Sequence, residues 1–74
     1  MECSRAIEYL VSEQGVSREL VKTLEQEGFR HTTMICPDVF EQMEYEKQLR
    51  IKYTDENIRI ITLKDNGMAY WVRG

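Results

Sequence analysis

The residues Asp65, Asn66 and Gly67 form the strongest turn signal in this sequence. Two runs rich in β-branched and aromatic side chains, 58–63 and 68–72, flank the turn. An Asn-Gly pair supplies the positive backbone φ angles that a tight hairpin turn requires. The pattern therefore predicts an antiparallel β-hairpin at the C-terminal end, which any fold of the chain must accommodate.

Residues 49–53 predict a third strand in front of the hairpin. Their side chains alternate between apolar and basic, which is the period of a strand with one buried face. The alternative is a helix that continues to Tyr53 and places Tyr45 and Leu49 on the same face. The strand is preferred because β-branched and aromatic residues cluster here.

The first third of the chain predicts two short amphipathic helices. The first spans 4–13, with Ser4 as N-cap and Gly15 as its stop, and the second begins after Ser17 and closes at Gly28. Their buried sides are expected to consist of Ala6, Ile7, Leu10 and Val11 in the first helix and Val21, Leu24 and Phe29 in the second. Together the two helices form a helical corner.

Residues 30–36 are ambiguous, because Thr32, Thr33 and Ile35 favour a strand but the run is short. Pro37 and Asp38 then mark the start of a third helix. Its apolar edge is expected to be Val39, Phe40 and Met43.

We therefore predict a single compact domain over 1–74 of the α+β class. It would consist of two N-terminal helices forming a helical corner, a third short helix, and a three-stranded antiparallel β-meander. The composition agrees with a globular chain, since 42% of residues are hydrophobic and only one is proline.

The N-terminus lacks the basic and apolar stretches of a secretory signal, and no apolar run approaches the roughly 20 residues of a membrane span. Two cysteines, Cys3 and Cys36, are too few for a disulfide scaffold, and we expect free buried thiols. A cytoplasmic location without a membrane partner follows as the expectation.

Catalytic and metal-binding constellations are not expected. His31 is the single histidine, and with two scattered cysteines it cannot supply the four ligands of a zinc site. Thr32 and Thr33 follow His31, but nothing there resembles a known nucleophile turn, and the four glycines form no phosphate loop. The sequence thus predicts a protein that is not an enzyme and has no cofactor.

The segment Gly15–Leu24 resembles the turn and second helix of a helix-turn-helix motif. Gly15 would make the turn, and Val16, Val21 and Leu24 would be buried at the motif's offsets. The resemblance implies a DNA-binding transcriptional regulator, related to winged-helix proteins and dimeric, that contacts DNA through Arg18, Lys22, Thr23 and Gln26. The acidic residues around this helix disfavour phosphate binding, so DNA binding is the alternative hypothesis.

Charge is distributed unevenly along the chain. Residues 1–46 hold four basic against ten acidic residues, and 47–74 hold six against three. If the apolar residues of the predicted meander face the helices, its cations point to the opposite side, where an exposed Trp would form the centre of a protein interface. The interface candidates are Arg50, Lys52, Arg59, Trp71 and Arg73. The alternative places Trp71 in the core.

The leading hypothesis is a small non-enzymatic interaction module that regulates or inhibits a larger macromolecule by binding its surface. Charge would steer the encounter, and a few aromatic and arginine side chains would hold the complex. Compact acidic chains of this kind resemble regulators and inhibitors encoded by phages and other mobile elements. A protein is the expected partner, nucleic acid is the alternative, and a homodimer is compatible with both.

Overall fold

The backbone of residues 2–74 and the side chains of residues 5–74 are described by a computed structural model. The elements, in chain order, are α1 (Glu2–Ser12), α2 (Arg18–Gln26), β1 (Arg30–Ile35), α3 (Val39–Lys52), the 3₁₀ turn η1 (Asp55–Asn57), β2 (Ile58–Thr62) and β3 (Met68–Val72). The predicted Ser4 cap is wrong, because α1 begins at Glu2 and Ser4 lies inside the helix. The predicted burial of Cys3 concerns a side chain outside the described residues.

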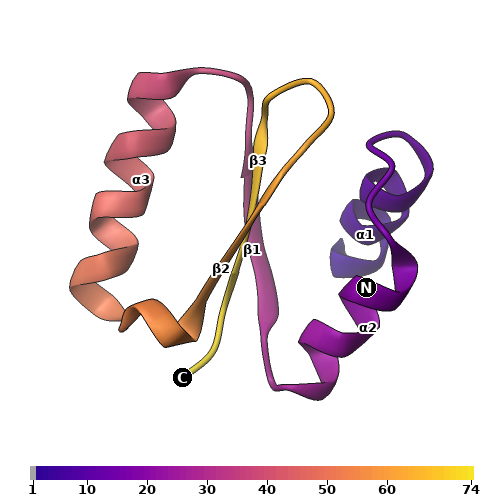
Figure 1. Cartoon of the computed structure of the whole chain (residues 1–74), viewed down its shortest axis with the longest axis horizontal. Helices are drawn as coiled ribbons and strands as arrows, with labels where there is room; N and C mark the ends of the chain where they lie inside the picture. The colour runs from indigo at the N-terminus through magenta and orange to yellow at the C-terminus, as the bar shows by residue number, and fades with distance from the viewer. Residues whose placement is uncertain (1) are drawn as a thin grey trace.

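The α+β class is confirmed, with three α-helices and a three-stranded antiparallel sheet among the described residues. The strand order is β1-β3-β2, so the sheet is not the simple meander that we predicted. β3 lies in the centre and pairs antiparallel with both neighbours, which makes β1 and β2 parallel to each other. α3 is the crossover between these two outer strands (Figure 1).

The predicted strand 49–53 is wrong, because residues 39–52 form one helix of 14 residues, the longest in the described chain. The alternative considered for this segment, a helix that continues toward Tyr53, is correct. The sheet stabilises the helix, because Tyr45 and Leu49, four residues apart, lie on one helical face and pack against Ile58 and Tyr70. The ambiguous run 30–36 contains the strand β1, Arg30–Ile35. The third helix is long rather than short.

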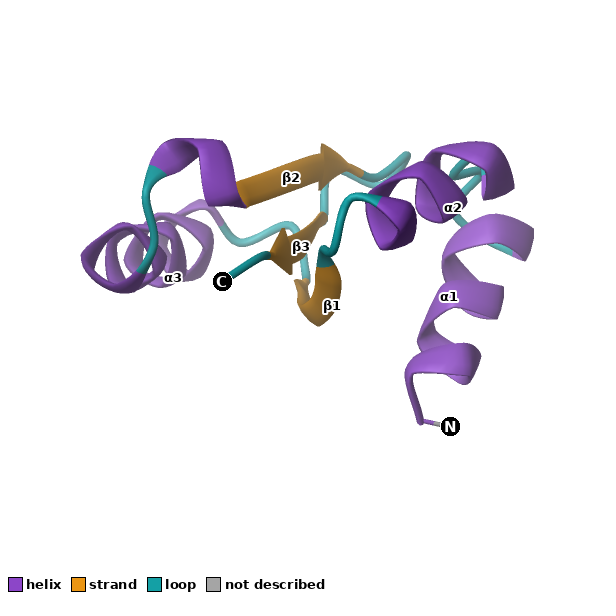
Figure 2. Ribbon diagram, turned by 90° about the horizontal axis from the view of Figure 1, so that it is seen from below, coloured by secondary structure: helices purple, strands orange, loops and turns teal. Residues whose placement is uncertain are grey.

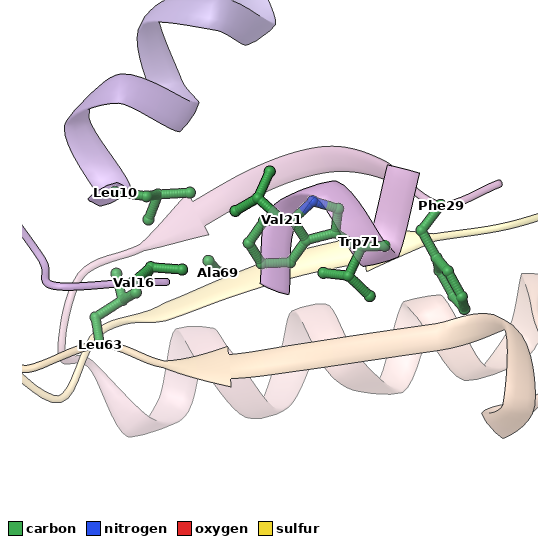
Figure 3. Packing of buried hydrophobic residues seen from close by; sticks show 8 residues of the cluster. Leu10, Val16, Val21, Phe29, Leu63, Ala69 and Trp71 are labelled. Carbon is green, nitrogen blue, oxygen red and sulfur yellow. The ribbon is translucent and has the colours of Figure 1, made fainter. Parts of the chain in front are cut away.

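Helices cover both faces of the sheet, with α1 and α2 on one side and α3 on the other (Figures 1 and 2). Successive residues of β3 alternate between the two sides, as predicted. Facing α1 and α2 is a buried cluster of Leu10, Val16, Val21, Leu24, Phe29, Leu63, Ala69 and Trp71 (Figure 3). Facing α3 is a second buried cluster of Leu49, Ile58, Tyr70 and Val72.

The β2–β3 hairpin is confirmed, but its turn differs from the prediction. The Asn66 N–H donates to the Leu63 carbonyl at 3.0 Å, and the Leu63 N–H donates to the Gly67 carbonyl at 2.8 Å. The loop thus has three residues, with Asn66 in the left-handed region at φ 70°. At Gly67 a Cβ would meet the Ile35 carbonyl oxygen at 2.9 Å, so glycine is required there by close approach of the backbone.

The helix signals of α2 are confirmed. The Ser17 hydroxyl accepts from the Leu20 N–H at 3.4 Å, and Gly28 has a positive φ of 91° where the helix closes. Gly15, which follows α1, has a φ of 71°. Short-range capping chemistry therefore sets these boundaries.

Candidate protein-interaction surface

Helix α3 begins where its capping chemistry places it. The Asp38 carboxylate accepts from the backbone N–H of Phe40 at 3.1 Å and of Glu41 at 3.2 Å. These bonds satisfy two of the orphan donors of the first turn, and the negative charge suits the helix N-terminus. Pro37, immediately before the cap, was predicted to mark this start.

The inner face of α3 is attached to the sheet by aromatic packing and hydrogen bonds. The rings of Tyr45 and Tyr70 meet edge to face with centroids 4.8 Å apart. The Tyr70 hydroxyl donates to Glu46 Oε2 at 3.0 Å. Burial, together with this hydrogen bond to a carboxylate, raises the pKa of Tyr70 far above its ordinary value of 10.0, so the phenol stays protonated.

Gln42 connects the first turns of α3 to the hairpin. Its Nε2 donates to the carbonyl of Cys36 at 2.9 Å and to that of Asn66 at 3.2 Å. Gln42 is the one buried polar residue of the described core, and its bond to Asn66 joins segments 24 residues apart in sequence. The helix is therefore held at its N-terminal end as well as along its middle.

The outer face of α3 carries large apolar side chains in solvent. Phe40 is 83% exposed and Ile51 is 82% exposed, while Val39 and Met43 are 64% and 61% exposed. Between them lie the exposed charged residues Glu44 and Lys47. We call these six residues the α3 outer face. Scattered surface apolar residues are ordinary, but four on one helix of 14 residues mark a candidate interaction site.

The expectation that Val39, Phe40 and Met43 form the buried edge of the third helix is wrong. Helix α3 is apolar on two sides, and the sheet takes the side with Tyr45 and Leu49. The signal was present in the sequence: a helix with Tyr45, Leu49 and Tyr53 on one face directs Phe40 and Ile51 to the other. These two faces exist only if residues 49–52 are helical, so the strand prediction did not reveal them.

Trp71, predicted as a possible interface centre, is in the core with 0% exposure. Its indole lies between the sheet and α2, in the cluster that contains Val21 (Figure 3). Because the side chain is not accessible, it does not form a surface with the predicted arginines. The alternative that places Trp71 in the core is correct.

Arg59 and Arg73 converge on Phe29 rather than on solvent. Their guanidinium carbons lie 4.7 Å and 4.6 Å from the centroid of the Phe29 ring. Arg73 also donates to Asn57 Oδ1 at 3.0 Å and to the carbonyl of Glu27 at 3.2 Å. This clamp joins the end of α2 to the sheet, which is a structural role.

Arg50 and Lys52, the other interface candidates, lie in the last turn of α3. Arg50 is engaged within the chain, because its Nη1 lies 3.6 Å from Glu46 Oε1 and its Nε lies 3.2 Å from Asp55 Oδ1. Lys52 is exposed. The structure thus places two of the five candidates on α3, Trp71 in the core, and the half-buried Arg59 and Arg73 over the Phe29 ring.

The DNA-contact candidates Arg18, Lys22, Thr23 and Gln26 are all exposed on α2. Arg18 is paired with Glu8 of α1 at 3.0 Å. The hydrogen bond from Arg18 and its charge lower the pKa of Glu8. The exposed acidic residues Glu19 and Glu25 lie on the same helix, so phosphate binding has little electrostatic support, and DNA binding stays a prediction.

A hollow of about 310 Å³ opens between the end of α1, the end of β1 and the hairpin. Tyr9, Gln14 and Cys36 line it together with apolar side chains, and Gln14 Nε2 donates to the Tyr9 hydroxyl at 2.8 Å. Cys36 is free, as expected, but it is exposed rather than buried, since it lies on the loop where β1 leaves the sheet.

Among residues 5–74, no three His, Cys, Asp or Glu side chains come close enough to hold a metal ion. No helix within the described chain is both long and apolar enough to cross a membrane. No protein-family model, curated protein or solved structure matches the chain.

Proposed function

We propose that this chain is a non-enzymatic protein-binding module that regulates a larger assembly by occupying a protein surface, and that its contact surface is the α3 outer face. The observation that carries the proposal is the exposure of Phe40, at 83%, with Met43 and Ile51 on the same face of a firmly anchored helix. Burying such side chains against a partner contributes about 25 cal/mol per Å² of apolar area.

The rigidity of α3 supports this function. The helix is capped by Asp38, joined to the hairpin by Gln42 and packed on the sheet through Leu49, so its outer face is held in one conformation before binding. A preorganised surface loses little conformational entropy when a partner docks. An amphipathic arrangement of this kind is a common way for a helix to enter a partner's groove.

The free thiol of Cys36 supports placement in a reducing compartment such as the cytoplasm. Its side chain is exposed, and unpaired exposed cysteines persist where thiols are kept reduced. This placement belongs to the proposal, together with the expected protein partner.

The test is affinity capture from a lysate of the source cells, with and without nuclease. We expect a protein to be captured by the wild type after nuclease treatment and to be lost with Phe40→Ser. Leu20→Ser is the control. Leu20 is also a large exposed apolar residue, at 42%, but it lies on α2. The control should retain the partner.

Two results would contradict the proposal. One is capture of nucleic acid, with all protein signal lost on nuclease treatment, which would favour the helix-turn-helix hypothesis. The other is a protein partner that Phe40→Ser retains and Leu20→Ser loses, which would move the contact surface to α2. Substrate turnover by the purified chain would overturn the non-enzymatic part.

A further inference from the structure

The α3 outer face contains a stripe with a two-fold pattern. Its members are Phe40, Glu44, Lys47 and Ile51, at spacings of four, three and four residues. This spacing keeps all four on one side of a helix. Read from either end, the stripe runs from an apolar residue through two charged residues to an apolar residue, and the two central charges are opposite.

Such a stripe is complementary to a second copy of itself when the two helices run antiparallel. Phe40 of each copy then lies opposite Ile51 of the other, and Glu44 of each copy lies opposite Lys47 of the other. Both copies then make the same contacts, as a two-fold axis requires. In a parallel arrangement the same stripe would bring Glu44 against Glu44 and Lys47 against Lys47, which like-charge repulsion disfavours.

We propose that a second copy of this chain docks on the α3 outer face, with the two α3 helices antiparallel, to form a two-fold symmetric dimer. This inference goes beyond the proposed function: the second copy would cover the α3 outer face in the free protein, and a larger partner would displace it. In the described part of the chain, α3 forms the outer layer on its side of the sheet, so a second helix has access to it (Figures 1 and 2).

Burying these four side chains against a second copy has a small energetic cost. Phe40 and Ile51 are 83% and 82% exposed in the single chain, so contact between copies removes apolar area from water. Glu44 and Lys47 are paired within the helix at only 3.7 Å, with side chains 71% and 76% exposed. An exposed pair of this kind contributes little, so exchanging it for pairs between copies costs little.

The dimer is expected to be weak. Helix α3 has 14 residues, which at 1.5 Å per residue corresponds to a contact about 21 Å long. A contact between two short helices falls below the roughly 1,200 Å² of a standard stable interface. We therefore expect a dissociation constant in the micromolar range or weaker, and an equilibrium that depends on concentration.

The test uses charge exchange at the centre of the stripe and sedimentation velocity from about 10 μM to about 1 mM, a range suited to a weak interface. Glu44→Lys alone places four lysines at the centre of the dimer, and Lys47→Glu alone places four glutamates there. Each variant is expected to weaken self-association about tenfold or more. Circular dichroism verifies that both exposed substitutions leave the helices intact.

An equimolar mixture of the two variants is the decisive sample. Antiparallel pairing places every lysine of one variant opposite a glutamate of the other, so the mixture is expected to recover association. The double variant Glu44→Lys/Lys47→Glu is also expected to dimerise, because it only reverses the charges. Lys22→Glu, on the exposed face of α2, is the control and should behave as the wild type.

The inference is overturned if the wild type stays monomeric at about 1 mM, or if it associates and neither single exchange weakens it. A monomeric wild type that still captures a protein through Phe40 overturns the dimer alone and leaves the proposed function standing. A dimer that follows the charge pattern, with no other protein captured, supports the inference and restricts the partner to the chain itself.

Discussion

The imidazole of His31 and the indole of Trp71 meet edge to face, with ring centroids 5.0 Å apart. His31 Nε2 and Trp71 Nε1 are both buried without a hydrogen-bond partner among the described residues. His31 is opposite Trp71 in the β1–β3 pairing, next to the register shift before Thr33. Two neighbouring rings thus each hold a buried, unpartnered nitrogen on the side of the sheet that α2 covers, and both nitrogens affect stability.

Stability is expected to fall in mild acid because of His31. Burial lowers the pKa of His31 below its ordinary 6.5, so the folded chain resists protonation more than the unfolded chain does. The unfolded state then binds more protons, and the free energy of unfolding decreases as pH falls below 6.5, until the folded pKa is passed. Urea denaturation of the wild type and of His31→Gln, followed from about pH 8 to about pH 5, measures the difference. Equal pH slopes in the two proteins would contradict this role.

Truncating Trp71 is expected to threaten the fold rather than a binding surface. Trp71→Ala should lower the free energy of unfolding by about 3–5 kcal/mol, which is comparable to the total stability of a small domain. Trp71→Phe should cost clearly less, because it keeps most of the packing and removes an unpartnered N–H whose burial costs about 1–3 kcal/mol. Urea denaturation ranks the two variants, and equal destabilisation by both would contradict the packing role of the aromatic ring.

Replacing Arg73 by lysine is expected to destabilise the chain although the charge is kept. An ammonium group cannot reproduce the guanidinium contacts with Asn57, the Glu27 carbonyl and the Phe29 ring. We expect a loss of about 1–3 kcal/mol in the free energy of unfolding. The exposed Arg5 provides the control, since Arg5→Lys should leave the urea midpoint unchanged. Equal midpoints for both variants would show that the clamp contributes nothing.

The hairpin loop is expected to tolerate change at Asn66 and not at Gly67. Asn66→Gly retains the positive φ of 70° and should shift stability little. Gly67→Ala places a Cβ 2.9 Å from the Ile35 carbonyl oxygen, and relieving that contact requires the backbone to move. We expect a cost of at least about 1 kcal/mol. Thermal unfolding followed by circular dichroism compares the two variants. An unchanged melting temperature for Gly67→Ala would contradict the close approach of the Ile35 carbonyl oxygen.

Much of the candidate surface could not be predicted because it depends on which side of α3 is buried. Helix α3 is apolar on two sides, so periodicity alone does not select which of them is buried. The choice follows from the sheet, where Tyr70 and Ile58 provide the apolar surface against which Tyr45 and Leu49 pack. Once that face is buried, Phe40 and Ile51 are left exposed.

The sequence by itself determined the features that depend on neighbours along the chain. The Ser17 cap, the Gly28 closure, the helix start at Asp38, the hairpin and the alternation of β3 all follow from short-range sterics and hydrogen bonding. The tertiary structure decided what depends on competition between distant segments. β1 occupies the second edge of β3, residues 49–52 continue α3 and pack Leu49 on the sheet, Trp71 is enclosed beneath α2, and Arg59 and Arg73 lie over the Phe29 ring. Each of these outcomes depends on contacts between segments far apart in sequence, so no local pattern along the chain determines it.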